Sequence, residues 1–244
     1  MSAAREPVTI ELGPGTADAD HAPALLLDGV EKAFVTPAGP VPVLDGVDLA
    51  VAAGEVVAMG GRSGSGKTTL LTIVAGWERP DAGTVALLGG EVPPDGLAWA
   101  DLAILPQSLG LLDELTLGEN VALPSRLGAV RPDEDLDPDV DGPDALMRRL
   151  GLDHLAERYP TEVSLGERQR AALARAAVLR PRLLLADEPI AHQNHAWAEV
   201  MTFVLRDLAD RGSACLLATH DPLAFAVADR VVRLDAGRLG ALAG

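Results

Sequence analysis

One short stretch in the first third of the chain constrains the fold more than any other feature. Residues Gly61 to Thr68 read Gly-Arg-Ser-Gly-Ser-Gly-Lys-Thr, which is the spacing of a phosphate-binding loop. The apolar run Val56 to Met59 lies directly before it, and Leu70 and Leu71 lie just after it. This context predicts a buried strand that leads into the loop and a helix that leaves it. The chain is therefore expected to bind a nucleoside triphosphate.

The residue types in this loop each suit a phosphate ligand. Glycines let consecutive backbone N–H groups close round phosphate oxygens, and a helix that opens at Lys67 adds its N-terminal dipole. The Lys67 ammonium can bind the β and γ phosphates, and the Thr68 hydroxyl can bind Mg²⁺. The expected nucleotide-binding residues of the loop are Gly61, Arg62, Ser63, Gly64, Ser65, Gly66, Lys67, Thr68 and Thr69.

Short apolar runs elsewhere in the chain fall into two groups. Runs at 25–27, 41–51 and 85–88 are separated by Gly, Pro and Asp, which predicts an antiparallel layer beside the nucleotide core. Compact runs at 56–59, 103–105, 183–186, 214–218 and 231–234 suit central, mostly parallel strands. Helical patterns at 67–75, 166–179, 195–209 and 222–228 alternate with them. The expected fold class is α/β, a P-loop NTPase core with an antiparallel β subdomain and a helical insertion.

The same patterns predict the domain organisation. The chain has 244 residues, enough for one large domain that carries an insertion. Residues 1–23 mix Pro, Gly, Ala and Asp without periodicity and are expected to form a flexible N-terminal tail. The domain is expected over residues 24–240. Between Gln107 and Ser164 the pattern is mainly helical, which predicts a helical subdomain at about residues 108–165.

Composition argues against several partners and locations. The chain carries 20 basic and 36 acidic residues, a net charge of −16, so nucleic acid is not an expected partner. No stretch reaches the roughly 18 to 20 apolar residues of a membrane span, and no signal-peptide pattern follows Met1. A cytoplasmic location is expected, and a membrane role requires another chain. Cys215 lies in an apolar run and is expected to be reduced and buried.

A later apolar run ends in two adjacent carboxylates, Asp187 and Glu188. Two acids at this place suggest two roles. Asp187 can hold the hydration shell of Mg²⁺, and Glu188 can orient and polarise the water that attacks the γ-phosphate. His220 follows a further apolar run, where an imidazole can contact the γ-phosphate and support the water. Taken singly, each of these residues also has a structural explanation.

Five motifs in a fixed order carry a resemblance to a known family. They are the glycine loop, Gln107, the segment Ser164 to Arg170 (Ser-Leu-Gly-Glu-Arg-Gln-Arg), the pair Asp187 and Glu188, and His220. This order resembles the nucleotide-binding subunit of ABC transporters over residues 24–240. The stretch Leu115 to Pro124, together with Gly166 to Arg170, is most similar to the branch of lipoprotein-releasing, macrolide-exporting and cell-division ATPases.

The resemblance implies an ATP-hydrolysing motor subunit. Two such subunits, identical or different, would close head to tail round two ATP molecules, with Ser164 and Gly166 of one completing the site of the other. Gln107 would sense the γ-phosphate and Mg²⁺ and connect the site to the helical insertion, whose outer surface would meet an integral membrane permease. The chain would then lie on the inner face of the cell membrane. Phe34 resembles the residue that stacks on adenine, although a core aromatic is the alternative.

The resemblance also assigns roles to the remaining site residues. Catalysis would fall to Glu188, His220 and Gln107, and Mg²⁺ would be held by Thr68, Gln107 and Asp187.

Two positions depart from the family pattern. Leu165 occupies a position that is usually glycine, and Asn194 ends the loop 190–194, which commonly ends in Leu-Asp. If the backbone at Leu165 is left-handed, its Cβ costs roughly 1 to 2 kcal/mol, and its side chain can crowd the opposing nucleotide. We hypothesise that these changes slow hydrolysis or make it depend on a partner, whereas ATP binding survives.

Two other functions are weighed against the motor. An ATP-gated regulatory or binding module with little turnover draws its support from Leu165 and Asn194. A phosphate-release assay with and without the permease separates it from the motor. A soluble ATPase of DNA repair or chromosome maintenance is opposed by the acidic charge and by the absence of long heptad segments.

Two patterns that suggest other metals are weak. Asp137, Asp139 and Asp141 have calcium-loop spacing, but Arg148 stands where such a loop needs a bidentate Glu, so a solvated loop is the prediction. His192 and His195 have no third or fourth zinc ligand nearby. We expect both histidines at a dimer interface instead.

Overall fold

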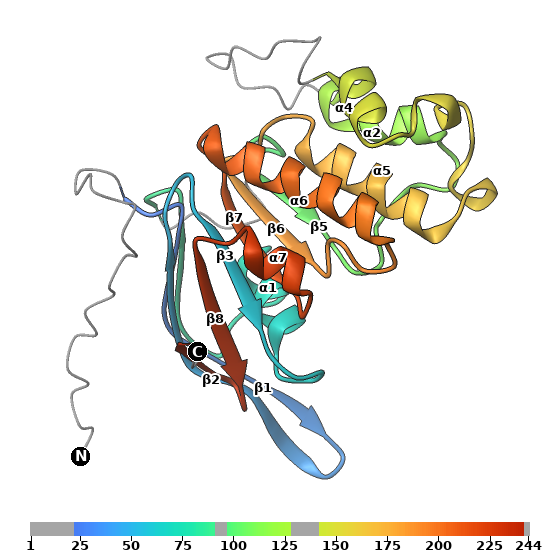
Figure 1. Ribbon diagram of the computed structural model, residues 1–244. Coiled ribbons are helices and arrows are strands. Elements are labelled where there is room, and N and C mark those ends of the chain that lie inside the picture. The colour runs from blue at the N-terminus through green and yellow to red at the C-terminus, as the bar shows by residue number, and fades with distance from the viewer. Residues whose placement is uncertain (1–21, 91–96, 128–141, 242–244) are drawn as a thin grey trace, which may run out of the picture.

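The computed structural model describes residues 22–90, 97–127 and 142–241, which form two sheets and a set of helices (Figure 1). The larger sheet has six strands in the order β5-β6-β7-β3-β8-β9. Neighbours from β5 to β8 run parallel, and β9 is antiparallel to β8. The strands are β3 (Val56–Gly60), β5 (Leu102–Leu105), β6 (Leu183–Asp187), β7 (Ala214–Ala218), β8 (Arg230–Asp235) and β9 (Arg238–Ala241). The predicted parallel core is confirmed.

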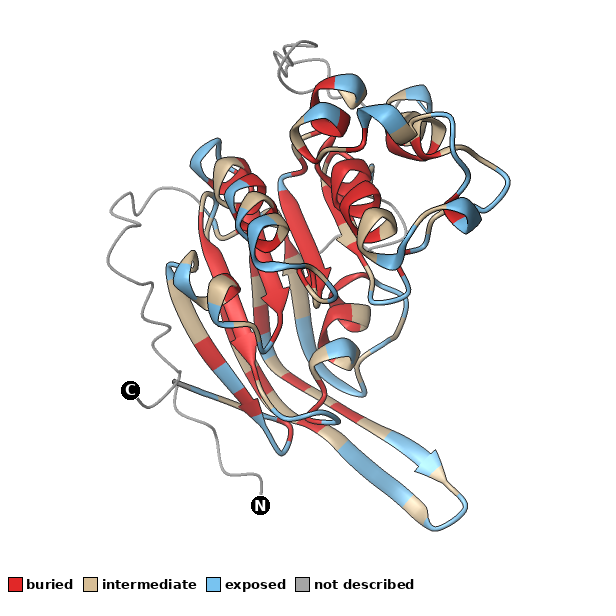
Figure 2. Ribbon diagram, turned by 45° about the vertical axis from the view of Figure 1, so that its right-hand side comes forward, coloured by how far each residue is buried: buried red, intermediate tan, exposed pale blue. Residues whose placement is uncertain are grey.

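The smaller sheet is antiparallel, as predicted, with the order β2-β1-β4. Its strands are β1 (Leu25–Thr36), β2 (Gly39–Val51) and β4 (Ala82–Leu87). The far end of the β1–β2 hairpin projects beyond the body of the protein in Figure 1 and is exposed in Figure 2. Phe34 pairs with Val41 near this end.

The larger sheet is buried on both faces, which explains why its strands read as continuous apolar runs. Leu184 and Ala186 of β6 pack on the side of α5 (Leu165–Ala177) and α6 (His195–Asp210). The alternating residues Leu183 and Leu185 pack on the other side, with α1 (Lys67–Val74) and the small sheet. Figure 2 shows β3, β6 and β7 as the most buried strands. The nucleotide loop is thus anchored to a rigid layer.

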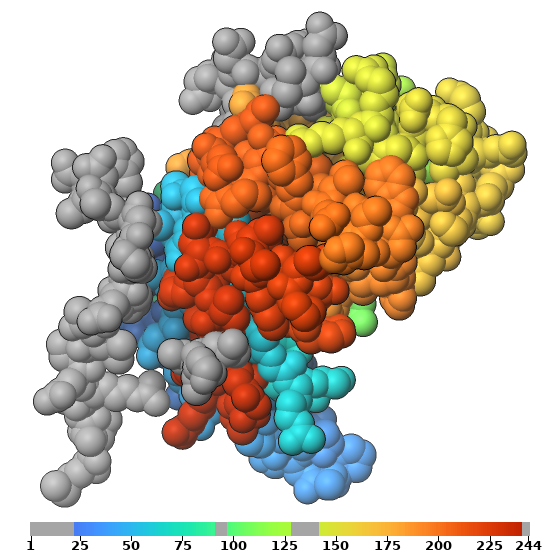
Figure 3. Space-filling view, in the orientation of Figure 1, coloured from blue at the N-terminus to red at the C-terminus, as the bar shows by residue number. Residues whose placement is uncertain are grey.

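Between β5 and β6 the described residues form helices and no strand. They are α2 (Leu117–Arg126), α4 (Pro143–Arg149), the 3-10 turns η2 (Asp153–Leu155) and η3 (Pro160–Glu162), and α5; a further helix, α7 (Pro222–Ala226), follows β7. Figure 3 shows this helical segment at the opposite end of the molecule from the β1–β2 hairpin. No helix in the described ranges has the length and apolar character needed to cross a bilayer.

Several sequence predictions concern residues that lie outside the described ranges. The N-terminal tail predicted for residues 1–23 is outside them except for Ala22 and Pro23. The calcium-like loop is outside them from residue 128 to 141. The domain limits 24–240 and the helical subdomain at about 108–165 therefore stay predictions.

A contact between Arg170 and Trp197 joins α5 and α6 to the segment after α4. The Arg170 guanidinium lies 4.1 Å from the centre of the Trp197 ring, and its Nε donates to the Leu150 carbonyl at 2.9 Å. Gly151 follows with a left-handed φ of 66°, and the Trp197 indole fills the space that a Cβ would need there. Only glycine fits this position, because the turn and the ring leave no room for a side chain.

We expect Gly151→Ala to lower the free energy of unfolding by about 3 kcal/mol, from left-handed strain of roughly 1–2 kcal/mol and overpacking against Trp197 of similar size. Gly212→Ala is the matched control, because Gly212 has φ 99° and no atom within 4 Å of an added Cβ. Urea denaturation of both variants measures the difference. Equal losses would show that the indole does not resist the methyl group.

Candidate functional site

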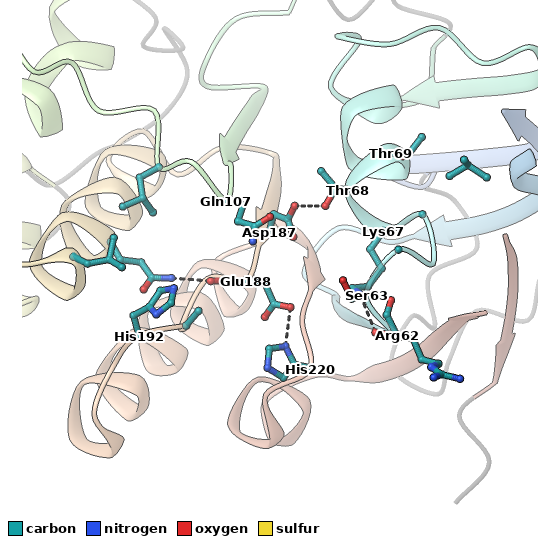
Figure 4. A pocket seen from close by; sticks show the side chains of 18 of the residues that line it. Arg62, Ser63, Lys67, Thr68, Thr69, Gln107, Asp187, Glu188, His192 and His220 are labelled. Carbon is teal, nitrogen blue, oxygen red and sulfur yellow. Dashed lines mark hydrogen bonds and ion pairs between the residues drawn. The ribbon is translucent and has the colours of Figure 1, made fainter. Parts of the chain in front are cut away.

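Four neighbouring parallel strands bring the predicted site residues to one edge of the sheet. Gln107 lies two residues after β5, Asp187 ends β6, His220 lies two residues after β7, and Gly61 follows β3. Carboxyl ends of parallel strands share one edge, where α/β proteins bind ligands. A cleft of about 1020 Å³ opens at this edge. In Figure 4 Glu188 and His220 face the phosphate loop across the cleft, and a dashed line joins Thr68 to Asp187.

The cleft collects most of the predicted residues. Its wall includes Phe34, Gly61, Arg62, Ser63, Gly64, Gly66, Lys67, Thr68, Thr69, Gln107, Asp187, Glu188 and His220, and also Leu165, Gln169 and His192. Ser65, Ser164 and Gly166 are not part of this wall. Ser65 is buried inside the loop, whereas Ser164 is exposed at the start of α5.

Two polar side chains of the phosphate loop, Lys67 and Ser65, lie where a phosphate ligand can reach them. The Lys67 ammonium donates to the carbonyls of Gly61 at 2.8 Å and Arg62 at 3.2 Å, so it lies across the loop. The buried Ser65 hydroxyl has no hydrogen-bond partner among the described residues. A Cβ on Gly61 would collide with the Leu234 carbonyl and come within 2.8 Å of Ser65 Oγ. A triphosphate, rich in acceptor oxygens, fits this loop.

Thr68 and Asp187 form the second part of the site. The Thr68 hydroxyl donates to Asp187 Oδ2 at 2.7 Å. Asp187 is 6% exposed, and burial raises the pKa of its carboxyl, while the hydrogen bond from Thr68 opposes that rise. Hydroxyl and carboxylate oxygens are hard ligands of the kind that Mg²⁺ prefers. The pair is therefore chemically suited to a magnesium ion beside the phosphates.

Glu188 is held from β7 and from α5. Its Oε1 lies 2.8 Å from His220 Nδ1, its Oε2 accepts from Thr219 Oγ1 at 3.3 Å, and its N–H donates to the Ala218 carbonyl at 2.8 Å. From α5, Gln169 Nε2 donates to the Glu188 carbonyl at 2.7 Å. The φ of Glu188 is 51°, a left-handed conformation that costs a non-glycine residue about 1–3 kcal/mol and is concentrated at functional sites.

Ser164 caps α5. Its hydroxyl accepts from the Glu167 N–H at 3.3 Å, and its own N–H donates to Glu167 Oε2 at 2.8 Å. Hydrogen bonds from the Ser164 hydroxyl and N–H lower the pKa of Glu167. The two residues form a reciprocal capping box. Ser164 itself is exposed and is not part of the cleft wall of its own chain. The participation of Ser164 and Gly166 in the site of another subunit stays a prediction.

The condition for left-handed strain at Leu165 is not met. Leu165 is the first residue of α5 and has no positive φ, because the Ser164 cap starts the helix immediately before it. The Leu165 side chain is 41% exposed and lies on the cleft wall. The prediction that the Leu165 side chain can crowd a ligand stays open, because this side chain faces the cleft.

Phe34 is not a core aromatic. It is 40% exposed on the β1–β2 hairpin and contributes to the cleft wall. The Lys32 ammonium lies 5.4 Å from the centre of its ring. The ring is thus available to a planar group in the cleft, and its stacking on adenine stays a prediction.

Three residues with roles at this edge were missed by sequence reasoning: Gln169, Gln193 and Arg175. Arg175 is buried in α5, and its guanidinium donates to the carbonyls of Gly110 at 2.6 Å and Leu109 at 2.9 Å. These bonds fix the segment that follows Gln107. The sequence signal for Arg175 was an arginine in a run of Ala and Leu. Such a run predicts a buried helix, and a buried cation needs hydrogen-bond acceptors from elsewhere in the fold.

A glycine loop after β3, a carboxylate at the end of β6 and the parallel sheet between them define a P-loop NTPase. Comparison with known proteins identifies the family. Residues 44–191 match the family model described as ABC transporter, and the chain belongs to this family.

Several relatives match over most of their length. The chain is 39% identical to the lipoprotein-releasing system ATP-binding protein LolD 2 of Caulobacter vibrioides, covering 89% of this chain and 96% of that protein. It is 40% identical to LolD of Ruegeria pomeroyi, covering 90% and 98%. The Fe(3+) ions import ATP-binding protein FbpC of Pasteurella multocida is 35% identical, and the match covers 88% of this chain and 60% of FbpC.

Solved structures show the same fold. The dimeric post-hydrolysis state of the ATP-binding cassette MJ0796 bound to ADP and Pi has a TM-score of 0.78 at 26% identity, with 90% of this chain and 99% of that chain covered. The protein described here is accordingly an ATP-binding and ATP-hydrolysing subunit of an ABC transporter. The regulatory module with little turnover is not favoured.

Proposed function

We propose that the chain is the magnesium-dependent motor ATPase of a lipoprotein-releasing type of system, docked on an integral membrane permease at the cytoplasmic face of the membrane. The observation that carries the proposal is the pairing of Thr68 with Asp187 and of Glu188 with His220 on one cleft wall. Its relatives LolD 2 and LolD are named for lipoprotein release. The permease itself would determine which substrate is moved.

Magnesium would be held by Thr68 and Asp187, with Gln107 on the same wall. When bound, the ion supplies positive charge to the β and γ phosphates. Lys67 would leave the loop carbonyls and bind the same phosphates, because charge-assisted bonds to phosphate are stronger than bonds to neutral carbonyls.

Glu188 would orient and polarise the attacking water, and His220 would steady both the carboxylate and the γ-phosphate. The Glu188 carboxylate is 18% exposed and the His220 ring is 78% exposed. The carboxylate is therefore partly shielded from solvent, while the imidazole stands at the open side of the cleft. Catalysis of in-line attack on a phosphate depends mainly on such positioning, since the protein forms no covalent bond to the phosphate.

The dimer would complete each site with the exposed N-terminus of α5. Ser164 and Gly166 lie there, and the helix dipole favours an anion at this end. The dimeric arrangement of MJ0796, which carries ADP and Pi, supports this reading. An identical second chain is the simplest partner.

The permease contact would lie beside Gln107. A groove of about 480 Å³ is lined there by Leu71, Ala75, Trp77, Ile104 and Pro106, together with Gln107 and Asp187. The Trp77 side chain is 62% exposed. An apolar groove next to a predicted γ-phosphate sensor suits a partner whose position must follow ATP binding.

Purification of the chain from detergent-solubilised membranes tests the proposal. We expect an integral membrane protein with few spans and a large extracytoplasmic part to co-purify and to stimulate phosphate release. A chain that purifies alone, and whose phosphate release no membrane fraction stimulates, would contradict the motor. The regulatory alternative predicts negligible release in both conditions.

Leu165→Gly and Leu165→Ala are expected to raise phosphate release about fivefold, the rate equivalent of removing ~1 kcal/mol of crowding. Because the backbone is helical, relief of crowding predicts that both substitutions act alike, whereas relief of backbone strain predicts an effect of glycine alone. Basal and permease-stimulated release are measured for both variants. If neither rate changes, Leu165 does not slow the ATPase.

A further inference from the structure

In the loop after Glu188, the half-buried side chain of Gln193 makes hydrogen bonds to α5. Its Nε2 donates to the Gly166 carbonyl at 2.9 Å and to Gln169 Oε1 at 3.2 Å. Its Oε1 accepts from Arg170 Nη1 at 3.2 Å. Gln193 thus uses both ends of its amide on residues of α5. A leucine at this position could make none of these bonds.

Gln169 carries the contact from Gln193 to the candidate catalytic carboxylate. Gln169 is 3% exposed, and its Nε2 donates to the Glu188 carbonyl at 2.7 Å. An amide has its acceptor and its donors on opposite sides. With Oε1 occupied by the donor of Gln193, the Gln169 amide keeps its N–H groups turned toward Glu188.

The backbone of Glu188 needs such support. Its φ of 51° is disfavoured for a residue with a Cβ. Three bonds hold it: the Glu188 N–H donates to the Ala218 carbonyl, and the Glu188 carbonyl accepts from the Ala191 N–H at 3.2 Å and from Gln169 Nε2 at 2.7 Å. The first two bonds are made by the backbone, whereas the shorter bond to the carbonyl depends on the two side-chain amides of Gln169 and Gln193. This side-chain bond is therefore the one that a substitution at Gln193 can change.

We propose that Gln193 is a positioning residue that acts through Gln169 to hold Glu188 in the orientation needed for hydrolysis. Gln193 is not part of the cleft wall, so it affects the reaction only through other residues. This inference rests on the proposed role of Glu188. Because Gln193 also binds the Gly166 carbonyl, the same network joins Glu188 to the stretch that would serve the partner's ATP.

Gln193→Leu tests the inference, because leucine has a similar volume and no polar atom. We expect kcat for ATP hydrolysis to fall about fivefold, equivalent to ~1 kcal/mol of transition-state free energy, with an unchanged KM for ATP. Gln193→Glu is expected to behave alike, because a carboxylate keeps the acceptor for Arg170 but has no N–H for Gly166 and Gln169. If kcat falls in Gln193→Leu but not in Gln193→Glu, the effect comes from the lost bond to Arg170. That result would overturn the proposed action through Gln169.

Arg149→Met is the matched control. Arg149 Nη1 bonds to Asp207 at 2.7 Å between α4 and α6, so this variant also removes a side-chain bond between two segments of the protein, but one that does not touch Glu188. We expect parental kcat and KM. An equal fall of kcat in this variant would mean that any loosening of the helices slows the enzyme, which would contradict a specific role for Gln193.

A double-mutant cycle with Gln169→Leu tests the order of the chain of contacts. If Gln193 acts through Gln169, the double variant is as slow as Gln169→Leu alone. If the fold losses of kcat in the two single variants multiply in the double variant, the inference is overturned. A parental kcat in Gln193→Leu would overturn it as well. The parent chain is assayed first. No ATP hydrolysis by the parent would refute the proposed function itself, whereas an active parent with unaffected variants would refute only the role of Gln193.

Discussion

Replacement of Glu188 by glutamine is expected to lower the rate of phosphate release at least about 100-fold, the usual minimum for loss of a general base. The amide keeps the size of the side chain and can still bond to Thr219 and His220. In the parent, Thr219 Oγ1 and His220 Nδ1 lie 3.3 and 2.8 Å from the Glu188 carboxylate oxygens. An amide cannot accept a proton from the attacking water. Binding of ATP is expected to remain, because the phosphate loop is untouched.

Glu188→Gln should also accumulate the ATP-bound dimer. Without hydrolysis, nothing opens the pair of subunits, so a sizing column run with ATP and Mg²⁺ is expected to show a species of twice the monomer mass. Glu119→Gln is the control, because Glu119 caps α2 and glutamine serves equally well in a capping box. Persistent monomers of Glu188→Gln at saturating ATP and Mg²⁺ would count against the ATP-closed dimer.

Lys67→Met is expected to weaken ATP binding by about 10- to 100-fold, the value of a charge-assisted bond of roughly 1.5–3 kcal/mol. The Lys67 ammonium is the cation that lies across the loop, at 2.8 Å from the Gly61 carbonyl. Methionine keeps the aliphatic length and loses the charge. The folded chain should tolerate the change, because the side chain is only partly buried.

Calorimetric titration with a non-hydrolysable ATP analogue measures the affinity of Lys67→Met. Arg238→Met removes the same charge from an exposed pair with Asp45, at 2.7 Å and outside the cleft wall, and should bind as the parent does. A similar loss in both variants would point to the overall charge of the protein. Parental affinity of Lys67→Met would remove Lys67 from the phosphate site.

The parts of the site that are local in sequence could be predicted. The glycine loop and the strand that ends in Asp187 each carry their chemistry within eight residues or fewer. Predicting that they meet required the family resemblance, since the contact of Thr68 with Asp187 spans 119 positions and depends on the order of the strands. The apolar runs identified the strands, but periodicity contains no information on which strand lies next to which.

Leu165 and Gln193 show where sequence reasoning stopped. The possibility of a left-handed backbone at Leu165 was raised because glycine is usual at that position. The local Ser164-x-x-Glu167 pattern is instead a capping box that predicts a helix starting at Leu165. The signal for the correct answer was present. For Gln193 there was none, because its partners on α5 are 23 to 27 positions away and meet it only in the folded chain.

The central claim is that each ATP site is built from the phosphate loop of one chain and the Ser164 stretch of another. It is tested most directly by mixing Lys67→Met and Ser164→Arg, at an ATP concentration too low to occupy the weakened Lys67→Met site, and measuring phosphate release. Each variant alone has no complete site. In a mixed dimer, the loop of the Ser164→Arg chain meets the intact Ser164 of the Lys67→Met chain.

Random pairing makes half of the dimers mixed, each with one complete site of two, so the mixture is expected to recover about a quarter of the parental rate. A mixture that stays as inactive as its two components, under conditions where the parent hydrolyses ATP, would contradict the shared site.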